Sequence, residues 1–101
     1  MSLANIVMLE FESEDAVDQF LRWYEALGFF PGNQVSLWVR TGETSVFSIN
    51  VYPDEETAAA AIRLRDEKFE ADGIKSIIRD IITYTGDTVV AAMDGKRLPW
   101  A

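Results

Sequence analysis

Four side chains of this 101-residue chain have the chemistry to hold a small organic ligand: Asn5, Trp23, Tyr24 and Arg65. The amide of Asn5 can orient a ligand carbonyl or phenol, or it can instead bond the backbone at a strand end. Trp23 and Tyr24 are adjacent near the end of a predicted helix, where they either wall an aromatic pocket or belong to the core. Arg65 is in register with apolar residues of a second predicted helix and can reach over a pocket rim. Aromatic walls with few polar groups suit a planar, largely apolar ligand.

The chain has no histidine and no cysteine. It therefore lacks the commonest general base, the commonest metal ligand, the usual proximal haem ligand and any thiolate nucleophile. We find no carboxylate pair with the spacing of a metal site, no glycine-rich phosphate loop and no serine in a nucleophile elbow. We expect no metal and no cofactor, and the sequence indicates no catalytic residue.

Composition narrows the class of protein further. The formal net charge is −8, which argues against nucleic acid as a partner because an acidic surface repels phosphates. No apolar run approaches the roughly 18 residues that a membrane span needs, and no basic leader of a signal peptide is visible. We expect a cytoplasmic protein without a membrane segment. A chain of 101 residues should form a single domain, over residues 1–101, and its 49% hydrophobic residues are enough for a core.

The first half of the chain predicts three strands and a helix. Residues 4–11 form a strand that is apolar on both faces, so we expect it to be covered on both. Ser13 is a good N-cap for a helix that ends at Gly28. Strands over residues 34–40 and 45–52, joined by a short turn, predict a hairpin.

The second half predicts a helix and a long strand. Asp54 can cap a helix over residues 57–72, and Gly73 lies where a C′ glycine belongs. Isoleucines at 74, 77, 78, 81 and 82 have helical spacing, yet β-branched residues favour strands. We expect a short helical turn over residues 74–78 and a strand from about 79 to 93, with a bulge or bend at Gly86. A turn at Asp94-Gly95 and a tail over residues 96–101 would follow.

This element order is βαββαβ, the ferredoxin-like arrangement of the α+β class. Two right-handed crossovers place both helices on one face of a four-stranded antiparallel sheet. We expect that covered face to hold Val7, Leu9, Phe11, Val35, Leu37, Val39, Phe47, Ile49 and Val51. The opposite face would show Ile6, Met8, Trp38, Val46 and Tyr52 with Ser36, Arg40, Ser48 and Asn50. Alternation would also place Glu10 and Arg40 on this opposite face, where the two side chains could form an ion pair.

The face without helices carries too much apolar surface to stay in water. A second copy related by a two-fold axis is the simplest cover, which predicts a homodimer with its sheets packed face to face, a dimeric α+β barrel. The alternative is a monomer whose C-terminal tail folds over the sheet, although so short a tail covers little area.

The βαββαβ order, and the strand-to-helix segment Val51-Tyr52-Pro53-Asp54-Glu55-Glu56, resemble the dimeric α+β barrel proteins. Within them the chain, from residue 4 to about 93, is most similar to the antibiotic biosynthesis monooxygenase-like family. Some members oxidise polycyclic phenols without a cofactor and others degrade haem. An Asn on the first strand recurs in both groups, and Asn5 matches its place. The family's second-helix Trp has no match because Ala58–Ala61 occupies that region, and the haem-ligating His is missing, which argues against haem degradation.

Two functions follow as hypotheses. The first is a cofactor-independent, monooxygenase-like enzyme acting on a small aromatic compound, a reaction that asks mainly for a dry pocket and hydrogen-bond donors. The second is a non-catalytic small-molecule-binding or stress-associated dimer, since fold alone does not determine function. In both cases we expect the ligand between the sheet and the helices, because Asn5 shares parity with Val7 and Leu9.

Overall fold

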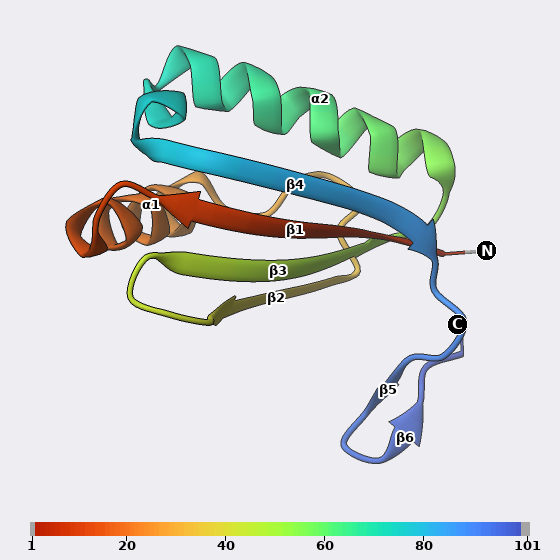
Figure 1. Ribbon diagram of the computed structural model, residues 1–101. Coiled ribbons are helices and arrows are strands. Elements are labelled where there is room, and N and C mark those ends of the chain that lie inside the picture. The colour runs from red at the N-terminus through yellow and green to blue at the C-terminus, as the bar shows by residue number, and fades with distance from the viewer. Residues whose placement is uncertain (1, 100–101) are drawn as a thin grey trace.

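Four strands form one antiparallel sheet in the order β2-β3-β1-β4 (Figure 1). The computed structural model describes residues 2–99. The strands are β1 (Leu3–Phe11), β2 (Val35–Arg40), β3 (Ser45–Tyr52) and β4 (Ile78–Asp87). Helices α1 (Glu14–Leu27) and α2 (Glu55–Ala71) both pack on one face of this sheet. The predicted ferredoxin-like α+β fold is confirmed.

Each helix begins at the capping residue that the sequence indicates. The Ser13 hydroxyl accepts a hydrogen bond from the backbone N–H of Ala16 at 3.1 Å. The Asp54 carboxylate accepts one from the N–H of Thr57 at 2.7 Å. Hydrogen bonds from Thr57 also lower the pKa of Asp54, because they stabilise its charged form. These side chains satisfy N–H groups that have no partner within the helix.

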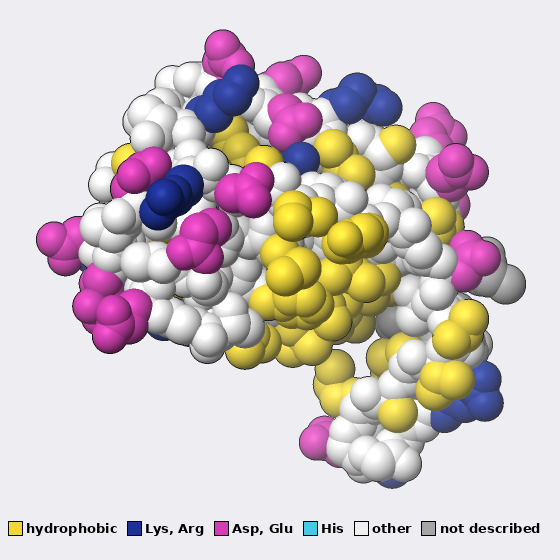
Figure 2. All heavy atoms as spheres, in the orientation of Figure 1, with side chains coloured by type: hydrophobic (Ala, Val, Ile, Leu, Met, Phe, Trp, Pro, Cys, Tyr) yellow, Lys and Arg dark blue, Asp and Glu magenta, His cyan; other side chains and the backbone are white. Residues whose placement is uncertain are grey.

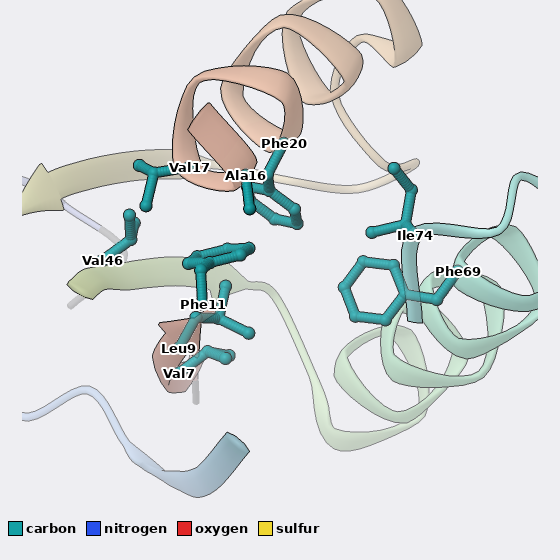
Figure 3. Close-up of a cluster of buried hydrophobic side chains, with 9 residues drawn as sticks. All are labelled: Val7, Leu9, Phe11, Ala16, Val17, Phe20, Val46, Phe69 and Ile74. Atoms are coloured by element: carbon teal, nitrogen blue, oxygen red, sulfur yellow. The ribbon is translucent and has the colours of Figure 1, made fainter. Parts of the chain in front are cut away.

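The core lies between the sheet and the two helices, and Phe20 of α1 is at its centre (Figure 3). The Phe20 side chain is fully buried, and its ring lies 5.0–6.0 Å, centroid to centroid, from four other aromatic rings. Those rings belong to Phe11, Trp23, Trp38 and Phe69, from strands β1 and β2 and from both helices. One aromatic side chain therefore joins the sheet to both of its covering helices.

The prediction of which sheet face the helices cover was right for β1 and wrong for β2 and β3. Val7 pairs with Ser48, and Ser48 pairs with Trp38, so these three side chains share the covered face. The covered face carries Asn5, Val7, Leu9, Ser36, Trp38, Arg40, Val46, Ser48, Asn50 and Tyr52. The open face carries Ile6, Met8, Val35, Leu37, Val39, Phe47, Ile49 and Val51.

The reversal of the predicted faces of β2 and β3 has a physical cause. Alternation shows that a strand has two distinct faces, but when both faces contain apolar residues it does not show which one is covered. The predicted ion pair between Glu10 and Arg40 is also absent, since the two side chains are on opposite faces. Arg40 pairs instead with Asp18 of α1 at 3.0 Å, and Glu10 accepts hydrogen bonds from Thr44 and Ser45.

The C-terminal part differs from the prediction beyond residue 87. Ile74–Ile77 forms a short 3-10 helix, η1, and β4 then ends at Asp87 rather than near residue 93. A separate hairpin of β5 (Ala92–Met93) and β6 (Lys96–Arg97) follows, where the prediction placed the end of β4 and a tail. The turn at Asp94-Gly95 is confirmed, and both residues have positive φ angles. Residues 100–101 of the predicted tail lie outside the described residues.

The irregularity in β4 is not at Gly86. That glycine pairs in regular register with Ala4, and the register shifts instead beside Glu10 and Phe11 of β1. There Phe11 pairs with Ile78 while Glu10 pairs with Asp80, which leaves one extra residue on β4. Within residues 2–99, neither helix combines the length and the apolar character needed to cross a membrane.

Truncating the central ring should be far more damaging than truncating an exposed one. We expect Phe20→Ala to lower the free energy of unfolding by about 3–5 kcal/mol, because it leaves a cavity between four rings. Phe29→Ala removes the same atoms from a side chain that is 75% exposed, and should change stability by no more than about 0.5 kcal/mol. Urea denaturation followed by far-UV circular dichroism measures both. Equal effects of the two substitutions would contradict this account of the core.

Candidate ligand-binding site

A narrow cavity of about 30 Å³ lies between the sheet and the helices. It is bordered by all four side chains that the sequence singled out, Asn5, Trp23, Tyr24 and Arg65. The other lining residues are Val7, Leu9, Phe20, Phe30, Trp38, Ser48, Asn50, Tyr52, Ala61, Ile62 and Phe69. Phe47 and Ile49, which could have filled this space, are on the other side of the sheet. A cavity of this size holds about one or two water molecules.

A row of polar side chains crosses all four strands beneath the cavity. Ser36, Asn50, Asn5 and Thr85 are successive cross-strand neighbours on the covered face. The Ser36 hydroxyl donates to the side-chain oxygen of Asn50 at 2.7 Å, and the Thr85 hydroxyl donates to that of Asn5 at 2.9 Å. The Asn5 amide nitrogen donates to the backbone carbonyl of Ala58 in α2 at 3.1 Å. Asn5 therefore links β1 to both β4 and α2 while it borders the cavity.

Trp38 and Tyr24 form the wall between the cavity and the surface. Their ring centroids are 4.3 Å apart, and the same two side chains also border a groove on the outside of the protein. The indole N–H of Trp38 donates to the Ser36 hydroxyl at 3.2 Å, which ties the ring to the polar row. Tyr24 also packs edge-on against Phe30, another residue of the cavity lining. Separation of Tyr24 from Trp38 would join the groove to the cavity.

Trp23 and Arg65 are each held by a partner at the rim of the cavity. The indole N–H of Trp23 donates to the Asp72 carboxylate at 2.7 Å. The Arg65 guanidinium pairs with Asp66 at 3.0 Å and donates to the Thr83 hydroxyl at 3.1 Å. Among residues 2–99, Arg65 is the one charged side chain in the cavity lining, and its charge is balanced by a neighbour on the same helix. Positioned groups of this kind can orient a bound molecule.

Four residues that line the cavity were predicted on the wrong face of the sheet: Trp38, Tyr52, Ser48 and Asn50. Ser48 and Asn50 are the two small polar residues among them, and both are buried on β3. The Ser48 hydroxyl finds no hydrogen-bond partner among residues 2–99. The available signal was the spacing of the two residues, because small polar side chains at alternate positions of an otherwise apolar strand point to one face. Buried polar side chains are uncommon in a core and are therefore informative.

Tyr52 supplies a phenol that stays neutral. Its side chain is buried on β3, and burial raises its pKa to about 12, with a further contribution from nearby Tyr24. In the part of the chain that the structure describes, none of the lining residues is an Asp, Glu, His or Cys. Within the described chain no group of three or more such residues could hold a metal ion. The lining therefore offers groups that donate and accept hydrogen bonds, set among aromatic rings.

Comparisons with known proteins extend this description of the fold. No protein-family model and no curated protein matches the sequence. A solved dimeric ferredoxin-like protein from an uncultured marine organism is 15% identical, with 93% of each chain covered and a TM-score of 0.73. SnoaB, a cofactor-independent oxygenase from Streptomyces nogalater, is 12% identical, with 87% of this chain and 93% of that chain covered and a TM-score of 0.65.

A third solved structure is a monooxygenase from Streptomyces coelicolor in complex with the ligand nanaomycin D. It is 10% identical, with 93% of each chain covered and a TM-score of 0.68. At these identities the comparisons show a shared fold. The fold of this chain is that of the dimeric ferredoxin-like proteins and of the antibiotic biosynthesis monooxygenase-like proteins, as the sequence resemblance predicted.

The buried phenol should make stability depend on pH in the alkaline range. The Tyr52 pKa is about 12 in the folded protein, against about 10 for an unfolded tyrosine. The unfolded state therefore loses its proton first, and the free energy of unfolding falls as pH rises from about 10 through 12. Denaturation at several pH values should show a smaller alkaline loss in Tyr52→Phe than in wild type. The exposed Tyr84 provides the control, and an equal change in Tyr84→Phe would contradict the assignment.

Proposed function

We propose that this protein is a homodimer in which each subunit binds a small, planar, largely apolar aromatic compound between its sheet and its helices. The observation that carries the proposal is the row of hydrogen-bonded polar side chains under an aromatic-walled cavity. Binding sites commonly combine apolar walls with a few placed polar groups.

The polar row is costly as a purely structural device. Burying hydroxyl and amide groups removes them from water, and the hydrogen bonds they form in the protein recover little net stability. The same sheet uses aliphatic residues on its open face, where Leu37 and Ile49 are cross-strand neighbours. A core that served only stability would place such residues against the helices. The chemistry of the covered face therefore favours a binding role.

Ligand entry requires movement of the aromatic wall, because the cavity admits little more than water as it stands. Tyr24 and Trp38 are each only partly buried and separate the cavity from the outer groove. A planar ligand that inserts between such rings keeps their apolar surfaces covered. The proposed ligand is therefore flat and enters by induced fit at Tyr24 and Trp38.

The open face of the sheet supports the dimer. Figure 2 shows hydrophobic side chains gathered over the sheet, with charged side chains around them. Leu37 and Val39 of β2 are both more than half exposed, and Met8, Ile82 and Tyr84 continue the patch across β1 and β4. The hairpin of β5 and β6 projects away from the sheet and leaves this face uncovered (Figure 1). One structural neighbour is itself a dimeric ferredoxin-like protein.

Oxygenation of the bound ligand without a cofactor is the second candidate function. SnoaB, a cofactor-independent oxygenase, and the monooxygenase from Streptomyces coelicolor share the fold, which favours this candidate. In such a reaction the cavity would exclude water, and Asn5 would orient the ligand oxygen. A helix tryptophan is missing from the Ala58–Ala61 segment of α2, and that difference favours binding without turnover. Oxygen consumption in the presence of a bound phenol distinguishes the two functions.

Asn5 should contribute to ligand affinity. A panel of phenols and quinones, titrated by tryptophan quenching, should include at least one compound that binds the wild type. Asn5→Ala should weaken that binding by about 1 kcal/mol or more, because a hydrogen bond to the ligand is lost.

Thr85→Val is the matched control for this test. It removes the hydroxyl that donates to Asn5 but leaves the Asn5 amide at the cavity. It should therefore reduce affinity less than Asn5→Ala does. Unchanged affinity in Asn5→Ala would remove Asn5 from the site, and failure of every compound to bind would defeat the proposed function.

The open face should mediate dimerisation. Sedimentation at micromolar concentration should give about twice the chain mass of 11.4 kDa. Leu37→Lys places a charge within the apolar patch, which should shift the protein towards the monomer because the charge would be buried unpaired. Gln19→Lys adds the same charge to the exposed surface of α1 and should leave the dimer intact. A monomeric wild type would refute the dimer.

A further inference from the structure

We propose that Ser48 is a specificity-determining residue that selects ligands carrying a neutral oxygen, a phenol hydroxyl or an aryl ketone or quinone carbonyl. This inference rests on the proposed function, because it concerns the same cavity. The oxygen of the ligand would lie against the middle of β3, and the rest of the ligand would lie between the aromatic walls of the cavity.

The position of Ser48 supports this role. On the covered face it lies between Val7 of β1 and Trp38 of β2, so it is at the centre of the sheet beneath the cavity. Its side chain has no solvent exposure, and its hydroxyl lacks a hydrogen-bond partner within residues 2–99. An unpaired buried hydroxyl is unfavourable, and a ligand oxygen in the cavity would satisfy it.

Several other polar groups of the covered face already have partners within the protein. Asn5 bonds both Ala58 and Thr85, and the side-chain oxygen of Asn50 accepts from Ser36. Arg65 is paired with Asp66 at the rim. Ser48 differs from these groups because its buried hydroxyl has no hydrogen-bond partner within residues 2–99, so a bond to a ligand would replace no bond in the protein. Such a group can contribute its full hydrogen-bonding capacity to binding.

The surroundings of Ser48 indicate a neutral ligand group. Val7, Leu9 and Trp38 border the same part of the cavity, and none of them can stabilise a charge by ion pairing. A buried carboxylate or ammonium without a counter-ion is strongly disfavoured. A serine hydroxyl both donates and accepts, so it suits a phenol hydroxyl and a carbonyl alike. The ligand class is therefore an uncharged hydroxy- or oxo-arene.

A packing role makes the opposite prediction. If Ser48 served only as a small residue beside the Trp38 ring, alanine would replace it without any effect on ligand choice. If its hydroxyl is retained for a ligand, Ser48→Ala should leave the free protein at least as stable as wild type, because it removes an unsatisfied polar group. The same change should reduce the affinity for oxygen-bearing ligands. Stability and affinity should therefore not fall together.

The test uses 2-naphthol and 2-methylnaphthalene, which have nearly the same shape and differ in one hydroxyl group. Equilibrium dialysis should show that the wild-type protein binds 2-naphthol about tenfold more tightly than its methyl analogue. Ser48→Ala should bind the two compounds equally, with its affinity for 2-methylnaphthalene unchanged. Ser76→Ala removes a surface hydroxyl of η1 that donates to Gly73, and it should keep the wild-type preference. Thermal unfolding of each variant gives the accompanying stability.

The outcomes separate this inference from the proposed function. If the wild type binds both compounds and Ser48→Ala keeps the preference for 2-naphthol, the inference is wrong and the binding function stands. If neither compound nor any phenol of the panel binds, the proposed function fails and this inference fails with it. A crystal structure of the 2-naphthol complex should place the ligand oxygen within hydrogen-bond distance of the Ser48 hydroxyl. An oxygen bound elsewhere in the cavity would overturn the inference even if Ser48→Ala proved unstable.

Discussion

A sheet with two apolar faces needs cover on both sides, and two helices provide it on only one. In this chain the two faces differ in kind. The open face is rich in aliphatic side chains such as Leu37 and Val39, which suit a flat contact with a second sheet. The covered face combines aromatic rings with hydroxyl and amide groups and retains a narrow cavity. Because both faces need cover, the same sheet would provide the dimer interface on its open face and the ligand site on its covered face.

Asn5 connects the site to the stability of the fold. Its side chain joins three elements that are far apart in sequence, since it bonds Ala58 of α2 and Thr85 of β4 from its place on β1. The same side chain borders the cavity, so the groups that would orient a ligand also hold α2 against the sheet. Ligand binding and the packing of α2 should therefore be coupled, because each depends on the geometry of one amide.

The chemistry of the cavity limits what the protein can do to a ligand. Its lining has a guanidinium balanced by Asp66 and a Tyr52 phenol whose pKa is raised by burial, and no described residue adds a carboxylate to it. In the proposed site these groups would supply hydrogen bonds and orientation to a ligand in a water-poor space. The structural neighbours include a cofactor-independent oxygenase, and a shared fold does not by itself determine function.

Local signals in the sequence determined the order of elements and the helix starts at Ser13 and Asp54, because capping and periodicity depend on residues close together in the chain. The alternation of residues in β1 also correctly predicted that Asn5 lies on the face covered by the helices. Only the tertiary structure decided the orientation of β2 and β3, because that depends on the register between Val7 and Ser48. The same is true of the end of β4, because Gly86 is compatible with a bend inside a longer strand as well as with a strand that ends at Asp87. The site, which adds Ser48 and Asn50 to the predicted residues, exists only once strands and helices distant in sequence are packed together.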